Sequence, residues 1–330
     1  MWRRVVLWLV FGILLVLGFR QANSIQQFSG VSLRFNEPIS GQAAHRARQH
    51  SIENAEQETF WLTFWYESTA ELSAGVRTVQ ANAISFSGDA ALVWTAQYLV
   101  GTAPSSLDGS GIAVSEALAH RLWGSTDIVG MPVYVNEKPR IVRGVFEGNF
   151  ELALLSFHIE DTQQSWTAVE LSGGESRSTR SNAESFAIAA GLGAPDYILM
   201  GGAMAVATFM SMLPLLIFTM YVLVLLILYV KKHYRSAATP IMFLGLIVFA
   251  ILLPILLNAL PAWLIPTHWS DFSFWSSLLQ QASGSLREFL SVNPMLRDVE
   301  LRMLLLGQVG IMVLSISCVI FCLTKENVVE

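Results

Sequence analysis

The sequence predicts an α+β extracytoplasmic domain joined to an all-α membrane bundle of four transmembrane helices. Hydrophobic residues make up 53% of the 330-residue chain and charged residues only 14%, whereas a typical soluble domain is about 25% charged. The apolar residues are gathered in a few long runs. One polar stretch between the first two runs, residues 20–200, is long enough to form a globular domain.

Three uncharged apolar runs are long enough to cross a bilayer, which takes roughly 20 residues. These runs span residues 203–230, 241–265 and 303–323. A shorter run, residues 5–19, follows Arg3 and Arg4. We interpret residues 1–19 as a first transmembrane helix or uncleaved signal anchor. A cleaved signal peptide is the alternative, since small residues occur near residues 22–24.

Basic residues in the short loops predict the orientation of the spans. Lys231, Lys232 and Arg235 lie in a short loop that has no acidic residue, so this loop and both termini are predicted to be cytoplasmic. The protein is then a multi-pass protein of the cell membrane. The non-membrane segments are 231–240 and 324–330 inside, and 20–200 and 266–302 outside.

The polar stretch contains strand-like and helix-like segments in alternation. Strands are expected over residues 23–36, 60–66, 78–86, 132–136, 140–146 and 166–171, and helices over 39–58, 115–122 and 182–191. Ser115 has the residue type of a helix N-cap. Gly124 suits the left-handed position that ends a helix, and Gly75 suits a hairpin turn. These patterns predict an α+β domain.

The charge of this stretch limits its partners. Residues 20–200 contain 11 Lys and Arg against 19 Asp and Glu, a net charge of −8. So acidic a segment argues against nucleic acid or anionic lipid as its partner.

The chain has two cysteines, Cys318 and Cys322, both in the last apolar run. The outer domain therefore has no disulfide framework, and the two cysteines are interpreted as small packing residues.

Motifs of catalysis are missing from the sequence. It contains no G-x-x-x-x-G-K-[ST], no H-E-x-x-H and no G-x-S-x-G. The six histidines are scattered, so no metal site is expected. We therefore predict that the chain is not an enzyme and holds no cofactor or metal. The apolar runs 5–19, 203–230, 241–265 and 303–323 also lack Asp, Glu, Lys, Arg and His, which argues against an ion-coupled pump.

One polar residue interrupts the third predicted span. Asn258 lies between Pro254 and Pro261, where freed backbone groups need partners inside a protein bundle. A kink or a hydrogen bond between helices is the simpler interpretation. A hinge that opens toward one side of the membrane is the alternative.

The stretch GIAVSEALAHRLWGSTDIVGMPVYVNEKPRIVRGVFEG, residues 111–148, carries the most informative pattern. It resembles the periplasmic core domain of MacB-like permeases, whose pattern is V-I-S-E-x-L-A-x-R-L-F-G followed by D-P-x-G and two short strands. That family belongs to the ABC transporters, and its permeases have four spans with a large outer domain between the first two. The resemblance implies a separate ABC ATPase, a second permease subunit or a homodimer.

The loop at residues 231–240 departs from that family. MacB-like permeases carry a stretch similar to R-E-I-G-I-R here, which docks the ATPase. This chain has only KKHYRSAATP, and Pro240 disfavours helix at the preceding residue. This difference argues against coupling to an ATPase. Lys231, Lys232 and Arg235 are the candidate residues of this loop to face one.

Two functional hypotheses follow. The first is a permease-like membrane subunit of an ABC transport system of the MacB or FtsX type, in which a separate ATPase drives motion of the outer domain. The second is a membrane-anchored sensing or binding partner without ATP coupling, which the short loop favours. A membrane protein whose outer domain is purely structural is the third and least specific interpretation.

The loop at residues 266–302 is rich in aromatic residues. Trp269, Phe272, Phe274 and Trp275 precede or begin an amphipathic segment, residues 274–290, that is expected to be helical. Aromatic residues at this level favour the boundary between membrane and water. The helix is therefore expected to lie on membrane lipid or against the outer domain. A lipid or peptide substrate site is the alternative.

Overall fold

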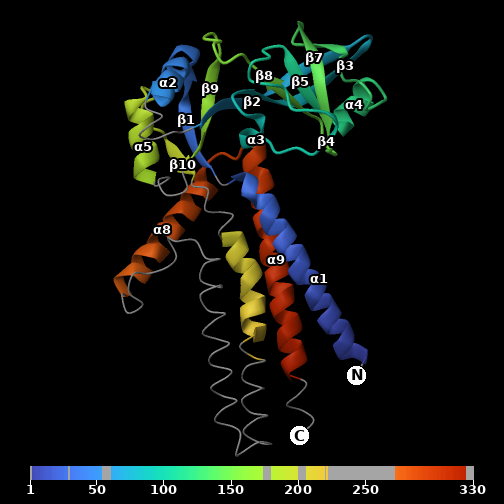
Figure 1. The fold of residues 1–330 in the computed structure, drawn as a ribbon, viewed down its shortest axis with the longest axis vertical. Helices are drawn as coiled ribbons and strands as arrows, with labels where there is room; N and C mark the ends of the chain where they lie inside the picture. The colour runs from blue at the N-terminus through green and yellow to red at the C-terminus, as the bar shows by residue number, and fades with distance from the viewer. Residues whose placement is uncertain are drawn as a thin grey trace, which may run out of the picture. The chain divides into compact units, whose positions relative to one another are not determined.

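The structure is a computed structural model of the full chain (Figure 1). It describes residues 2–28, 30–53, 61–173, 180–199, 206–219, 221 and 272–324. The chain divides into two compact units. The larger consists of residues 27–201 and 287–299, and the smaller of residues 1–26, 202–286 and 300–330. A short segment near the C-terminus therefore belongs to the larger unit.

The larger unit is a mixed α/β domain, as predicted. Its described residues form ten strands: β1 (Val31–Ser40), β2 (Trp61–Ala74), β3 (Arg77–Ser87), β4 (Tyr98–Gly101), β5 (Gly111–Ser115), β6 (Pro132–Val135), β7 (Lys138–Phe146), β8 (Leu152–Ser156), β9 (Ser165–Ser172) and β10 (Tyr197–Leu199). They make one sheet in the order β10-β1-β9-β2-β3-β8-β5-β7-β4, and β6 pairs with β2 and β7. Two pairs, β3–β8 and β5–β7, are parallel, and the other pairs are antiparallel.

Helices pack on this sheet over separate parts of its core. They are α2 (Gly41–Glu53), α3 (Ala90–Val93), α4 (Glu116–Leu122) and α5 (Arg180–Ala189), with the end of α8 (Phe272–Ser291) and the start of α9 (Leu296–Thr324). One hydrophobic cluster joins α2 and α5 to β1 and β9, and includes Leu33 and Trp166. A second packs α4 on β3, β5 and β7. A third contains Trp65 of β2, Phe86 of β3 and residues of α3.

The motif that carries the family resemblance folds largely as the sequence predicts. Ser115 is the N-cap of α4, and its hydroxyl accepts a hydrogen bond from the N–H of Leu118. Gly124 follows the helix with a φ of 77°, a conformation that glycine adopts without strain. Asn136 and Glu137 also have positive φ and form the two-residue turn between β6 and β7.

Several element boundaries differ from the prediction. The expected strand over 23–36 is wrong in its first part, because α1 (Trp2–Ser24) continues to Ser24 and a 3-10 turn follows over Ile25–Phe28. The helix expected over 39–58 corresponds to α2, which starts at Gly41 and is described as far as Glu53. Residues 54–58 of that prediction lie outside the described residues. Strands β4, β5, β8 and β10 were not predicted. β5 and β8 are buried throughout, so they lack the alternation that reveals a half-exposed strand.

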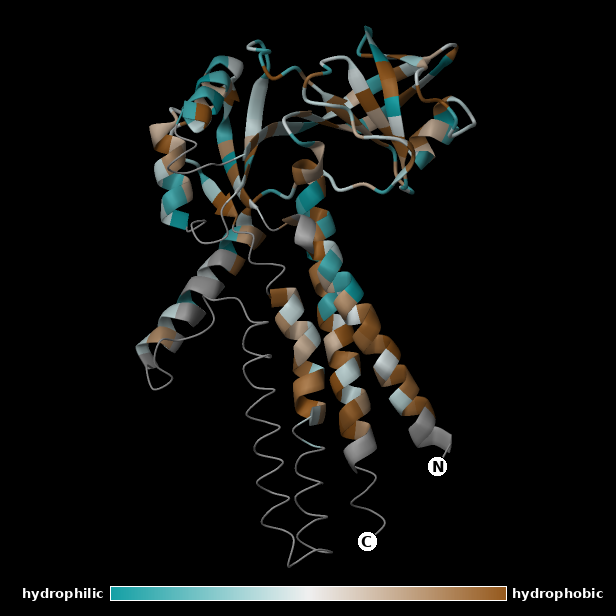
Figure 2. Ribbon diagram, in the orientation of Figure 1, coloured by the Kyte–Doolittle hydropathy of each residue, from teal (hydrophilic) through white to brown (hydrophobic). Residues whose placement is uncertain are grey.

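The smaller unit contains the apolar helices. Within the described residues, two helical stretches, Val6–Ser24 and Leu296–Phe321, are long and apolar enough to cross a membrane, and Val206–Thr219 is a shorter apolar helix (Figure 2). Gln308 of α9 is fully buried, and its Nε2 donates a hydrogen bond to Ser211 Oγ at 2.6 Å. Ser211 in turn donates to the carbonyl of Gly18 in α1. A polar side chain thus links three apolar helices.

Candidate functional site: a buried charge cluster

One face of strands β1, β9 and β2 carries polar side chains. The register places Glu170 of β9 between Ser32 of β1 and Thr63 of β2. Since alternate residues of a strand share a face, Arg34 and Trp65 lie on the same side of the sheet as Glu170. The opposite face of these strands carries apolar side chains that pack against α2 and α5. A polar strand face would ordinarily meet water, but this one is covered.

Residues 287–299 supply the cover. In this segment α8 ends, a short connection follows, and α9 begins. Met295 and Leu296 pack against the hydrophobic cluster around Trp65. The next two residues, Arg297 and Asp298, are only 5% and 4% exposed. The start of α9 is therefore part of the core of the larger unit.

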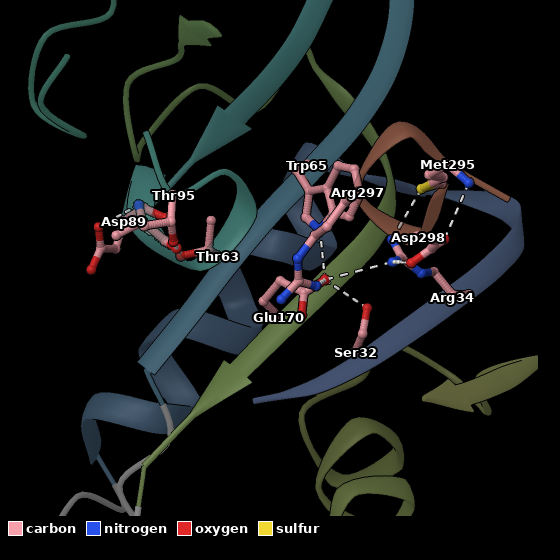
Figure 3. A network of polar contacts seen from close by, with 11 residues as sticks. Ser32, Arg34, Thr63, Trp65, Asp89, Thr95, Glu170, Met295, Arg297 and Asp298 are labelled. Carbon is pink, nitrogen blue, oxygen red and sulfur yellow. Dashed lines mark hydrogen bonds and ion pairs between the residues drawn. The ribbon is translucent and has the colours of Figure 1, made fainter. Parts of the chain in front are cut away.

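Four charged side chains meet under this cover, and we call Arg34, Glu170, Arg297 and Asp298 the buried charge cluster (Figure 3). Arg34 Nη2 lies 3.0 Å from Asp298 Oδ1 and 3.9 Å from Glu170 Oε1. Arg297 Nη1 lies 2.6 Å from the same Glu170 oxygen. Two cations and two anions give a neutral set. Pairing of this kind offsets the free energy that is lost when charged side chains are removed from water.

Neutral groups complete the surroundings of the cluster. Ser32 Oγ and Trp65 Nε1 donate hydrogen bonds to Glu170 Oε1 at 2.6 Å and 2.9 Å. The guanidinium of Arg34 lies over the Trp65 ring, 4.5 Å from its centroid, a distance at which cation–π attraction is significant. Glu170 Oε2 is buried and has no hydrogen-bond partner among the described residues. The pairing is therefore asymmetric, with Oε1 receiving all of the contacts.

Two carboxylates hold the first turn of α9. Asp298 Oδ2 accepts the N–H of Met295 at 3.1 Å, and Glu67 Oε1 of β2 accepts the N–H of Leu296 at 2.7 Å. The first N–H groups of a helix have no partner within it, and the helix dipole favours negative charge there. Burial raises the pKa of Glu67, and the N–H groups of Leu296 and Arg297 oppose this to a smaller extent.

A second ion pair holds the last turn of α8. Glu288 pairs with Arg180 of α5, and its Oε1 also accepts the N–H of Ile198 in β10 at 3.0 Å. Burial acts to raise the pKa of Glu288, but hydrogen bonds from Arg180 and Ile198 together outweigh it and lower the pKa. Residues 287–299 are thus held at both ends by the rest of the larger unit.

This second attachment predicts a pH dependence. Because the pKa of Glu288 is lower in the folded protein than its usual value of 4.5, its contribution to stability is present above pH 4.5 and is lost as the pH falls below it. We expect the urea midpoint of the full chain in detergent to fall more steeply on acidification than that of Glu288→Gln. Glu116→Gln, which changes an exposed carboxylate of α4, should follow the wild type. Parallel curves for Glu288→Gln and the wild type would contradict the assignment.

The site residues predicted from the sequence lie elsewhere. The loop residues Lys231, Lys232 and Arg235 and the hinge residues Pro254, Asn258 and Pro261 fall outside the described residues. Sequence reasoning missed the buried charge cluster. Its one visible signal was the pair Arg297 and Asp298, the first two of four charged residues that precede the apolar run 303–323. Within the part of the chain that the structure describes, no group of three or more His, Cys, Asp or Glu could hold a metal ion.

Comparisons with known proteins give matches at the level of structure. No model of a known protein family matches the sequence, and no curated protein matches it. The extracellular domain of the noncanonic ABC-type transporter YknZ from Gram-positive bacteria has a TM-score of 0.39 and 10% identity over 48% of this chain and 90% of its own.

Two further solved structures are similar over about half of the chain. The periplasmic region of MacB from Actinobacillus actinomycetemcomitans has a TM-score of 0.41 and 12% identity, covering 52% of this chain and 88% of its own. A domain of a protein described as a permease, from Porphyromonas gingivalis, has a TM-score of 0.34 and 14% identity, covering 49% of this chain and 83% of its own.

Proposed function

We propose that this chain is a permease-like membrane subunit of an ABC transport system, in which motion of the last span is transmitted to the extracytoplasmic domain. The proposal places spans at residues 1–19, 203–230, 241–265 and 303–323, and the extracytoplasmic domain at 20–200. Both termini are cytoplasmic in this arrangement. The pattern of residues 111–148 supports the family, because it resembles the MacB-type core domain.

The observation that carries the transmission of motion is the burial of the start of α9 in the extracytoplasmic domain. Arg297 and Asp298 are held there by Glu170 and Arg34. The same helix continues through its apolar part to Thr324. A displacement of this helix would pull directly on β1 and β9, since the paired charges cannot separate without leaving charge buried and unpaired.

The drive would come from a separate ATPase at the cytoplasmic loop. Lys231, Lys232 and Arg235 are the residues proposed to face it, and Pro254, Asn258 and Pro261 are proposed as the hinge in the third span. A homodimer or a second permease subunit would complete the membrane part. This chain needs no nucleotide site of its own in such an arrangement.

The experiment that tests this proposal is co-purification from native membranes. The wild-type chain in mild detergent is expected to retain a stoichiometric ABC ATPase, identified by mass spectrometry. The triple variant Lys231→Gln, Lys232→Gln and Arg235→Gln is expected to lose the ATPase, because the cationic loop is its contact. As a control, Arg46→Gln, Arg77→Gln and Lys138→Gln remove the same charge from exposed positions of the outer domain and should retain it.

The outcomes also separate the second candidate function, a membrane-anchored sensing or binding partner without ATP coupling. The ten-residue loop that ends at Pro240 favours this candidate, because it leaves little chain for a docking helix. Recovery of another permease with no ATPase would support it. Equal ATPase recovery with the triple variant would overturn the role of the loop.

A further inference from the structure

Helix α8 has an apolar face of unusual composition. At helical spacing, its large apolar residues fall on one stripe, with members three or four positions apart. The residues of this stripe are Trp275, Leu278, Leu279, Ala282, Leu286, Phe289 and Leu290. The remaining positions are mostly serine, glutamine and glycine, and Arg287 and Glu288 are the only charged residues of the helix. The helix is therefore amphipathic with almost no charge.

Part of this stripe is exposed on the surface of the structure. Leu286 and Leu290, four positions apart, are 57% and 59% exposed. Glu288 is already paired with Arg180 and with the N–H of Ile198. Glu288 is thus engaged within the larger unit, and Arg287 is the one other charged residue in the sequence of α8. Electrostatic attraction is not what brings a partner to this face.

We propose that α8 inserts its apolar stripe between lipids of the outer leaflet, and that this binding depends on gaps in lipid packing and not on anionic headgroups. Helices that bind membranes by charge have Lys and Arg across the polar face. The polar face of α8 consists of Ser273, Ser276, Ser277, Gln280, Gln281, Gly284, Arg287, Glu288 and Ser291. A helix of this kind gains its affinity from apolar insertion alone, so it binds where acyl chains are accessible.

The position of α8 in the chain identifies lipid as the occupant. An apolar run, residues 241–265, precedes the helix, and the apolar part of α9 follows it. Both neighbours are spans in the proposed arrangement, so α8 is tethered at the bilayer surface on either side. Trp and Phe near its start are the residue types that settle at that surface. The acyl chains of the outer leaflet are thus the large apolar phase that the stripe of α8 can contact. This inference rests on the spans of the proposed function.

The test uses the full chain in liposomes. In a background of Cys318→Ser and Cys322→Ser, single cysteines are introduced by Leu279→Cys or Leu286→Cys on the stripe and by Ser277→Cys or Gln280→Cys as matched controls on the polar face. Each is spin-labelled, and its collision rates with oxygen and with a water-soluble nickel chelate are measured. We expect a several-fold higher oxygen-to-nickel ratio at positions 279 and 286 than at 277 and 280.

Lipid composition then tests the packing dependence. Dioleoylphosphatidylcholine vesicles should give a high ratio at position 286, and adding cholesterol with saturated phosphatidylcholine should lower it. Adding dioleoylphosphatidylglycerol should leave it unchanged. Low collision rates with both reagents at 279 and 286 would overturn the proposal in favour of a protein covering the stripe. A ratio that rises with phosphatidylglycerol would overturn the packing dependence. The co-purification of an ATPase is a separate measurement, so its failure would count against the proposed function and would change neither of these collision ratios.

Discussion

Replacing Glu170 with alanine should lower the free energy of unfolding of the extracytoplasmic domain by about 3–5 kcal/mol, the cost of breaking a buried pair from one side. The Glu170 side chain is 1% exposed and is the acid shared by Arg297 and Arg34. Its removal leaves two guanidinium groups with Asp298 as the one remaining acid of the cluster. Ser32 Oγ and Trp65 Nε1 also lose their acceptor.

The measurement is urea unfolding of the full chain in detergent, followed by tryptophan fluorescence, since Trp65 and Trp166 are fully buried. The matched control is Glu151→Ala, which removes the partner of Arg121 in an exposed ion pair. Pairs of that kind contribute about 0–1 kcal/mol. Equal midpoints for the two variants would show that the cluster does not hold the domain together.

Local chemistry explains which parts of the fold the sequence could predict. The N-cap at Ser115 and the left-handed Gly124 depend on residues a few positions apart, so their signals survive in the sequence alone. The hairpin of β2 and β3 is another example, because Gly75 with a φ of 61° closes it. Each of these features is confirmed in the structure.

The buried charge cluster shows what the sequence could not predict. Arg34 and Asp298 are separated by 264 positions, and a single sequence holds no record of such a contact. The run Val31 to Phe35 alternates apolar with polar residues, which is typical of a strand with one face in water. The polar face is buried here only because residues 287–299 return to it. A tertiary contact thus buries a strand face that the local pattern predicts to be exposed to water.

Replacing Arg34 with methionine is the second large expected effect, and it should act on the attachment of α9. Methionine keeps much of the apolar volume but removes the cation of β1 that pairs with Asp298. We expect a loss of about 3–5 kcal/mol, as for other buried pairs broken from one side. Amide hydrogen exchange at residues 295–299 should accelerate more than exchange in β5 or β8. Arg143→Met, which breaks the more exposed pair with Asp108, should leave residues 295–299 protected.

Combining the two substitutions distinguishes a cluster from two separate contacts. Glu170→Ala alone leaves an excess of buried positive charge, and Arg34→Met alone leaves an excess of negative charge. The double variant retains Arg297 and Asp298, a neutral set, so its loss of stability should be smaller than the sum of the single losses by about 0.5–3 kcal/mol, the range for residues that share a network. Additive losses would mean that Arg34 and Glu170 act independently, as their separation of 3.9 Å allows. A difference within the expected range would show that the start of α9 and the strands β1 and β9 are joined by one electrostatic unit.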